Sequence, residues 1–142
     1  MARHRFFYLL NLARHRVHKH TDRVAQEELG VTNTQLGALF VIGSQPGISQ
    51  RELARTLGIN DSAITALVRR MSEAELLERV PSPDDARVMQ IRASRRGARI
   101  IKRAKPLLAR FNERLNEGFD EHELDVVARF LEAAIERFDQ EV

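Results

Sequence analysis

The segment from Ser49 to Gly97 decides the fold, and it reads SQRELARTLGINDSAITALVRRMSEAELLERVPSPDDARVMQIRASRRG. Its first half predicts two short helices, because Ser49 and Asn60 are favoured N-cap residues and Gly58 is a typical residue for ending a helix. The tight turn at residues 57–60 between them is typical of a helix-turn-helix. Their apolar residues recur at helical spacing and are expected to face one core: Leu53, Ala54, Leu57, Ile64, Leu67, Val68 and Met71.

The second half of the segment predicts a two-stranded antiparallel ribbon. Residues 76–80 and 88–92 have the length and composition of strands. Between them, residues 81–87 read PSPDDAR, a polar turn whose prolines exclude a helix or a central strand. A hairpin directly after the second helix of a helix-turn-helix is a wing. The expected fold class is therefore mainly α with a small β-wing.

Two helices are expected before the helix-turn-helix. The first helix is predicted from apolar or aromatic residues that alternate in spacing between four and three, with His20 at one intervening position. These residues are Phe6, Leu10, Ala13, Val17 and Val24. Gly30 is expected to end this helix. Thr32 and Gln35 form a capping-box pattern at the start of a second helix. Its apolar face is expected to be Leu36, Leu39, Phe40 and Ile42. Residues 43–47, GSQPG, should then interrupt the chain.

Two further helices are expected after the wing. Ser94 should cap a long helix that reaches about Glu117 and is kinked just before Pro106. Its inward residues are predicted to be Ile101, Ala104, Leu108, Phe111 and Leu115. Asp120 and Glu123 form a capping box for a final helix. One face of that helix carries Leu124, Val127, Leu131, Ile135 and Phe138.

The charge of the chain is unevenly distributed. Residues 44–103 carry twelve Lys or Arg against seven Asp or Glu, whereas residues 104–142 carry five against ten. A basic middle beside an acidic end suggests one lobe that binds a polyanion and another lobe with a different task. Charge alone leaves RNA and membrane surfaces open as partners.

Composition narrows the cellular setting. The absence of cysteine excludes disulfides, thiolate zinc sites and direct thiol redox sensing. No apolar run approaches the roughly 20 residues that span a bilayer. The apolar residues 6–10 follow basic residues as in a signal peptide, but Asn11 and Arg14 interrupt them too early. A cytoplasmic location is therefore expected.

Neither catalysis nor metal binding is expected. His15, His18 and His20 cluster on one helix, but no acidic residue lies at ligand spacing before Asp22. The Ser, His and Asp residues of the chain are not surrounded by a nucleophile elbow, a phosphate loop or a pair of carboxylates. We therefore expect no enzyme activity and no cofactor.

The order of helices and wing resembles the MarR (multiple antibiotic resistance regulator) family across essentially the whole chain. Asp85 and Arg87 match the family's Asp-x-Arg element at the wing tip, and Ser94 and Gly97 match the small hydroxyl residue and the glycine that open the next helix. The resemblance implies a regulator of transcription that binds double-stranded DNA at an approximate inverted repeat. It also implies a repressor that a small, often aromatic or anionic, molecule releases from DNA.

The residues expected to contact DNA follow from this resemblance and from physical chemistry. The N-terminal end of the second helix of the helix-turn-helix presents short side chains where the helix dipole favours phosphates and base edges are within reach. A wing-tip arginine can enter a minor groove, and a neighbouring carboxylate can hold it by a charge-assisted hydrogen bond. The expected set is Arg51, Ser62, Thr65, Ala66, Arg69, Arg70, Asp85, Arg87 and Arg95, with Arg55 and Arg96 as further phosphate contacts.

Two positions depart from the family pattern. Ala66 stands where arginine is frequent, so one expected base contact is missing, although an alanine can touch a thymine methyl group. Glu75 stands where glycine is common, between the second helix and the wing. The departure at Glu75 concerns the local geometry there and not the fold.

The resemblance further implies a homodimer built by the first, fifth and sixth helices. Residues 1–142 are then one domain, with a DNA-binding lobe at about 32–97 and a helical dimerisation lobe at about 3–30 and 98–141. In resembling proteins the effector pocket lies where these lobes meet, which here suggests Tyr8, Leu12, His15, Leu39 and Phe40.

The alternative is a winged-helix interaction or dimerisation module that does not bind DNA. Such a module does not need a basic wing tip, and Arg87 argues against it.

Overall fold

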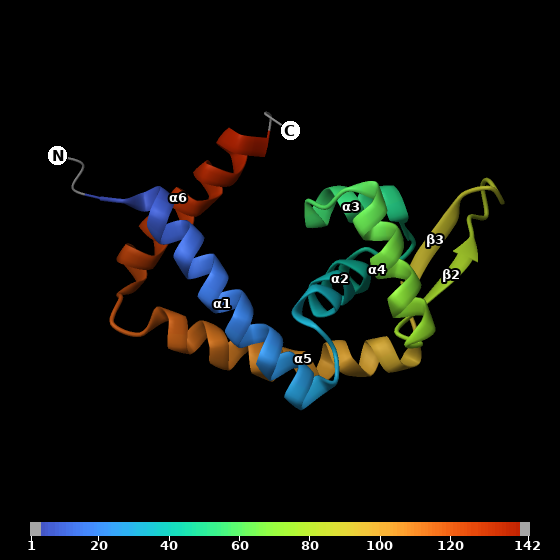
Figure 1. Ribbon diagram of the computed structural model, residues 1–142, viewed down its shortest axis with the longest axis horizontal. Coiled ribbons are helices and arrows are strands. Elements are labelled where there is room, and N and C mark those ends of the chain that lie inside the picture. The colour runs from blue at the N-terminus through green and yellow to red at the C-terminus, as the bar shows by residue number, and fades with distance from the viewer. Residues whose placement is uncertain (1–3, 140–142) are drawn as a thin grey trace. The chain divides into compact units, whose positions relative to one another are not determined.

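The computed structural model describes residues 4–139 of the 142-residue chain. The described residues form six helices and three short strands (Figure 1). In chain order these are α1 (Phe6–Leu29), α2 (Asn33–Ser44), β1 (Ile48–Ser49), α3 (Gln50–Leu57), α4 (Asp61–Glu73), β2 (Leu77–Pro81), β3 (Met89–Ala93), α5 (Arg95–Asn116) and α6 (Glu121–Asp139). The fold divides after Ala104, inside α5, into two compact units. The mainly α fold with a small β-wing is confirmed, and the winged helix lies in the first unit.

The helices begin at the capping residues predicted from the sequence. Thr32 and Gln35 form a complete capping box at the start of α2. Asn60 accepts a backbone hydrogen bond from the first turn of α4. Asp120 accepts from the Glu123 amide at 2.8 Å, and its own amide donates to the Glu123 carboxylate at 3.0 Å. Left-handed glycines end α1 and α3 as expected, at Gly30 and Gly58. Local polar contacts therefore set most of the helix boundaries.

The winged helix is built around an apolar core. Its buried side chains come from α2, α3, α4, the strands and the turn before β2: Ala38, Leu39, Ile42, Ile48, Leu53, Ala54, Ile64, Leu67, Val68, Met71, Leu76, Leu77 and Ile91. The inward residues predicted for α3 and α4 are confirmed except for Leu57, which is half-buried. Leu36 and Phe40 of α2 are likewise half-buried, and Ala38 takes their place in the core. The cohesion of this unit is thus hydrophobic, and it holds α4 by one face only.

The wing is an antiparallel ribbon as predicted, paired from Leu77 opposite Ala93 to Pro81 opposite Met89. In Figure 1 it projects as a hairpin to the right of α4. The two-residue strand β1 was not predicted; it pairs with β3 and completes a sheet of order β1-β3-β2. Two residues are too few for a periodic pattern, so only the pairing with β3 defines this strand. The predicted break after α2 is also shorter than expected, because the helix continues to Ser44.

The inward face predicted for α5 is confirmed at Ala104 and in part at Ile101, whose Cδ1 would lie 3.0 Å from a Cβ at Gly43. The buried residues are Gly97, Ile100 and Ala104, whereas Ile101 is half-buried. The backbone of Gly97 lies close to the Leu76 carbonyl oxygen, and this contact turns the face with Gly97, Ile100 and Ala104 inward. The buried residue at the first apolar turn is therefore Ile100, one position before the predicted Ile101. Further along, Phe111 is half-buried, and Leu108 and Leu115 are exposed. The helix continues through Pro106 without interruption.

The ends of the described chain expose much apolar surface. No residue of α6 is buried, although its predicted apolar face is present. Phe7 in α1 is 85% exposed, and Ile135 and Phe138 in α6 are 69% and 67% exposed. None of the helices in residues 4–139 has the length and apolarity needed to cross a membrane.

Candidate nucleic-acid interface

The outer face of α4 is polar where the helix begins and cationic where it ends. Ser62 and Thr65 are exposed and Ala66 is half-buried in the first two turns, and Arg69 and Arg70 are exposed a turn later. The opposite face of α4 is locked into the core, so these five side chains share the solvent side. Together with the positive end of the helix dipole, this face is suited to a polyanion.

Both hydroxyl groups on this face already take part in hydrogen bonds within the protein. The Ser62 hydroxyl donates to Asn60 Oδ1 at 2.9 Å. The Thr65 hydroxyl donates to the Asp61 carbonyl oxygen at 2.8 Å and accepts from Gln50 Nε2 at 3.2 Å. Sequence reasoning missed Gln50, because it lies 15 residues from Thr65 and only the packing of α3 against α4 brings them together.

The wing tip presents a positioned arginine. Asp85 Oδ1 accepts from the Arg87 backbone amide at 3.0 Å and from Arg87 Nε at 3.2 Å. The Arg87 side chain is 91% exposed, and that of Asp85 is 44% exposed. An ion pair this exposed contributes little to folding stability. Its consequence is geometric: the Asp85 carboxylate holds the Arg87 side chain through Nε, the kind of contact that the sequence predicts.

A group of hydrogen bonds ties the end of α4 to the start of α5. Arg96 Nη1 donates to the Ala74 carbonyl oxygen at 2.6 Å. The Ser94 hydroxyl donates to the Glu75 carbonyl oxygen at 2.6 Å and accepts from the Gly97 amide at 3.0 Å. One of the five guanidinium donors of Arg96 is therefore used at this corner, so we expect Arg96 to contribute less to phosphate binding than the sequence alone suggests.

The geometry of this corner explains why glycine is favoured at positions 75 and 97. Glu75 has φ of 59° and is, among the described residues, the one non-glycine in the left-handed region. That region favours glycine, so the departure noted in the sequence falls on a strained position. At Gly97 an added Cβ would overlap the Leu76 carbonyl oxygen and lie 3.2 Å from Leu39 Cδ2. Only glycine allows α5 to approach the wing this closely.

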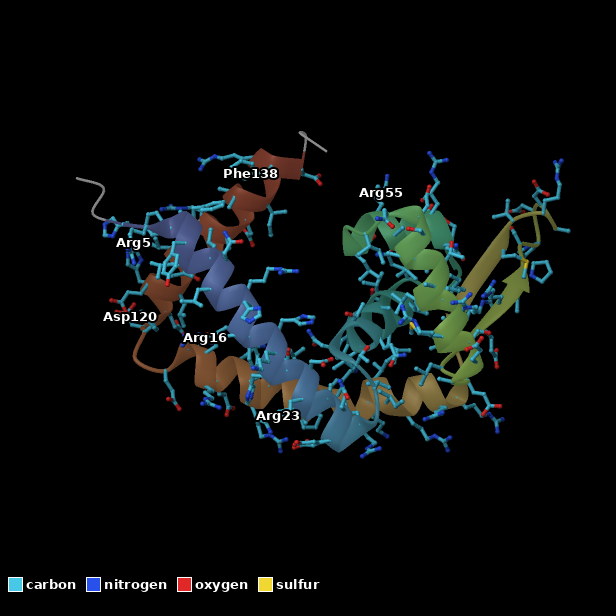
Figure 2. The ribbon with its side chains drawn as sticks, in the orientation of Figure 1. Arg5, Arg16, Arg23, Arg55, Asp120 and Phe138 are labelled. Atoms are coloured by element: carbon cyan, nitrogen blue, oxygen red, sulfur yellow. The ribbon has the colours of Figure 1, made fainter. Side chains whose placement is uncertain are left out.

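The remaining predicted cations lie on exposed surface. Arg51, Arg55 and Arg95 are all exposed, and Figure 2 shows the Arg55 side chain extending outward from α3. Arg95 occupies the first turn of α5, which holds no acidic residue. A cation is disfavoured at this end of a helix dipole. The helix dipole therefore gives no stabilising role to the Arg95 cation, and its phosphate contact stays a prediction.

The five residues suggested for an effector pocket have different surroundings. Leu39 is completely buried in the core, and Phe40 is half-buried. Leu12 is half-buried, whereas Tyr8 and His15 are exposed. A ligand could reach Leu39 only if the core opened. Across residues 4–139, no three His, Cys, Asp or Glu side chains are grouped so that they could hold a metal ion.

Helix-turn-helix, ribbon and positioned wing arginine together define a winged helix-turn-helix protein. Comparison with known proteins narrows the class. Residues 29–88 match the model of the MarR family. The resemblance seen in the sequence is confirmed.

Relatives and solved structures agree with this assignment. The chain is 35% identical over 71 residues to the HTH-type transcriptional repressor IacR of Pseudomonas putida, covering 50% of this chain and 42% of IacR. The chain spans about half the length of the first curated relatives it matches. FabT of Streptococcus pneumoniae, solved in complex with DNA, has a TM-score of 0.83 at 18% identity, covering 97% of this chain and 98% of FabT. PcaV of Streptomyces coelicolor, solved with its natural ligand, has a TM-score of 0.73 at 25% identity, covering 88% and 89%.

Proposed function

We propose that this chain is a repressor of transcription that binds double-stranded DNA sequence-specifically in the cytoplasm. The observation that carries the proposal is Arg87, which is almost fully exposed at the wing tip and hydrogen-bonded to Asp85. An arginine so placed suits the negative potential of a minor groove. The outer face of α4 with Arg69 and Arg70 suits the adjacent major groove. The name of IacR, a repressor, supports the direction of regulation.

The proposed assembly is a homodimer. The first turns of α1 and the apolar face of α6 each expose large side chains, Phe7 and Phe138 among them. Large exposed apolar side chains of this kind favour an interaction site on each of these helices. We assign residues of about 3–30 and 98–141 to dimerisation and about 32–97 to DNA binding. In a twofold dimer the two α4 helices would enter successive major grooves roughly 34 Å apart, on an operator that is an approximate inverted repeat.

A small aromatic or anionic effector is proposed to release the repressor. The solved complex of PcaV with its natural ligand supports ligand control in a protein of this fold. A ligand changes DNA affinity only if it favours one spacing of the two α4 helices over another. The proposed pocket residues remain Tyr8, Leu12, His15, Leu39 and Phe40, and Leu39 would become accessible only in a state with a more open core.

Titration of fluorescent duplex DNA with the purified protein at 50 mM and 200 mM salt tests the proposal. Binding should weaken steeply with added salt, because phosphate contacts release counterions. Arg87→Ala should weaken binding while the dimer, measured by sedimentation, stays intact. Absent or salt-independent binding would favour the interaction module. Loss of the dimer in Arg87→Ala would contradict the wing assignment.

A further inference from the structure

The hydrogen bonds of Thr65 limit how it can contact a base. Its hydroxyl hydrogen is directed to the Asp61 carbonyl oxygen, and Gln50 donates to the same oxygen atom. This arrangement holds the hydroxyl against the preceding turn of α4 and against α3. In a staggered rotamer the γ-methyl group must then occupy a different position. Because Thr65 is exposed, the methyl group is the part of the side chain that remains for a base edge.

The neighbouring positions have the same character. Ala66 offers only a methyl group, and the hydroxyl hydrogen of Ser62 is directed to Asn60. Across the first two turns of its outer face, α4 therefore presents methyl groups and oxygen acceptors, while hydroxyl donors are used internally. Cationic donors begin only at Arg69, and Arg70 Nε already donates to the Ala66 carbonyl oxygen at 3.3 Å. A helix face of this kind does not suit the acceptor-rich edge of guanine.

We infer that Thr65 and Ala66 read thymine through its C5-methyl group, and that Gln50 is the positioning residue that holds Thr65 for this contact. The thymine methyl is the one apolar group that a base pair presents in the major groove. Operator half-sites should therefore carry thymine opposite the first two turns of α4. The inference deepens the proposed function and rests on it.

Replacing thymine by uracil removes only the methyl group and tests the inference directly. Two random duplex libraries, one synthesised with thymine and one with uracil, would be selected in parallel with the purified protein. The thymine library should yield a half-site with an invariant thymine. The uracil library should lose the preference at that position and keep the rest of the site. The same preference in both libraries would overturn the inference.

Variants of Thr65 separate the methyl group from the hydroxyl. Thr65→Val keeps a methyl group and removes the hydroxyl, whereas Thr65→Ser does the reverse. On the selected site, wild type and Thr65→Val should bind the uracil duplex about fourfold more weakly per half-site, as expected for one buried methyl group. Thr65→Ser should discriminate less than wild type, keeping only the part that Ala66 contributes. If instead Thr65→Ser keeps the discrimination and Thr65→Val loses it, the hydroxyl is the reader and the inference is wrong.

Ser62→Ala is the matched control, because it removes a hydroxyl from the same face. It should lower affinity for the thymine and uracil duplexes by the same factor. Gln50→Ala should reduce the discrimination between the duplexes without changing the dependence on salt. If the protein binds neither the thymine nor the uracil duplex, the proposed function itself is wrong. Salt-dependent binding without thymine discrimination overturns only the inference.

Discussion

Removing Arg96 should weaken the corner between α4 and α5 without removing a contact with DNA phosphate. The Arg96 guanidinium donates to the Ala74 carbonyl oxygen at 2.6 Å, and hydrogen bonds of charged groups contribute about 1.5–3 kcal/mol. Because Arg96 is exposed, solvent competes for both partners and the loss should fall to about 1 kcal/mol. Arg96→Ala should therefore lower the free energy of unfolding by about 1 kcal/mol, or Tm by roughly 3–5 °C. Urea and thermal unfolding followed by circular dichroism measure both.

Binding assays on the same variant separate positioning from phosphate contact. Arg96→Ala should lower DNA affinity by a similar factor at every salt concentration, so the slope of log K against log salt stays that of wild type. Arg95→Ala is the matched control on the preceding residue, whose side chain is exposed in the first turn of α5. It should reduce the slope by about 0.9 per protomer bound and leave stability unchanged or slightly higher. A reduced slope with unchanged stability for Arg96→Ala would refute this reasoning.

Three further outcomes follow from the structure. Gly97→Ala should cost about 2 kcal/mol of unfolding free energy in urea titration, because its Cβ overlaps the Leu76 carbonyl oxygen; an unchanged midpoint would contradict the close approach. Glu75→Gly should stabilise the protein by about 0.5 kcal/mol in the same assay, since relief of the left-handed strain exceeds the added freedom of the unfolded chain; a destabilised variant would contradict the strain. Ile135→Asp should convert the dimer to monomer in analytical ultracentrifugation, because a charge cannot be buried unpaired in an apolar interface; a persistent dimer would place the interface elsewhere.

Features specified by neighbouring residues could be predicted from the sequence. Thr32 with Gln35, and Asp120 with Glu123, cap their helices through contacts three residues apart. The wing ribbon could be predicted because its turn and strands are continuous in the chain. The ion pair at the wing tip joins residues two positions apart, and it was predicted for the same reason.

Features that depend on distant contacts could not be predicted. The strand β1 exists only through its pairing with β3. The buried face of α5 follows from the approach of Gly97 to the wing, which periodicity does not reveal. Arg96 resembles its exposed neighbours in sequence, yet its partner Ala74 lies 22 residues away. The pocket residues were inferred from family resemblance alone, and the depth of Leu39 in the core could not be read from its spacing.

Cleavage of operator DNA from the wing tip is the most direct test of how this protein grips a duplex. The chain has no cysteine, so Ala86→Cys gives a unique site for an iron-EDTA label beside an intact Arg87. On a selected operator, the labelled protein should cut the minor groove in two clusters, placed symmetrically about the operator centre. The control Glu113→Cys, exposed on α5, should not produce these clusters. No cutting from residue 86, or the same pattern from both labels, would contradict a wing that enters the minor groove.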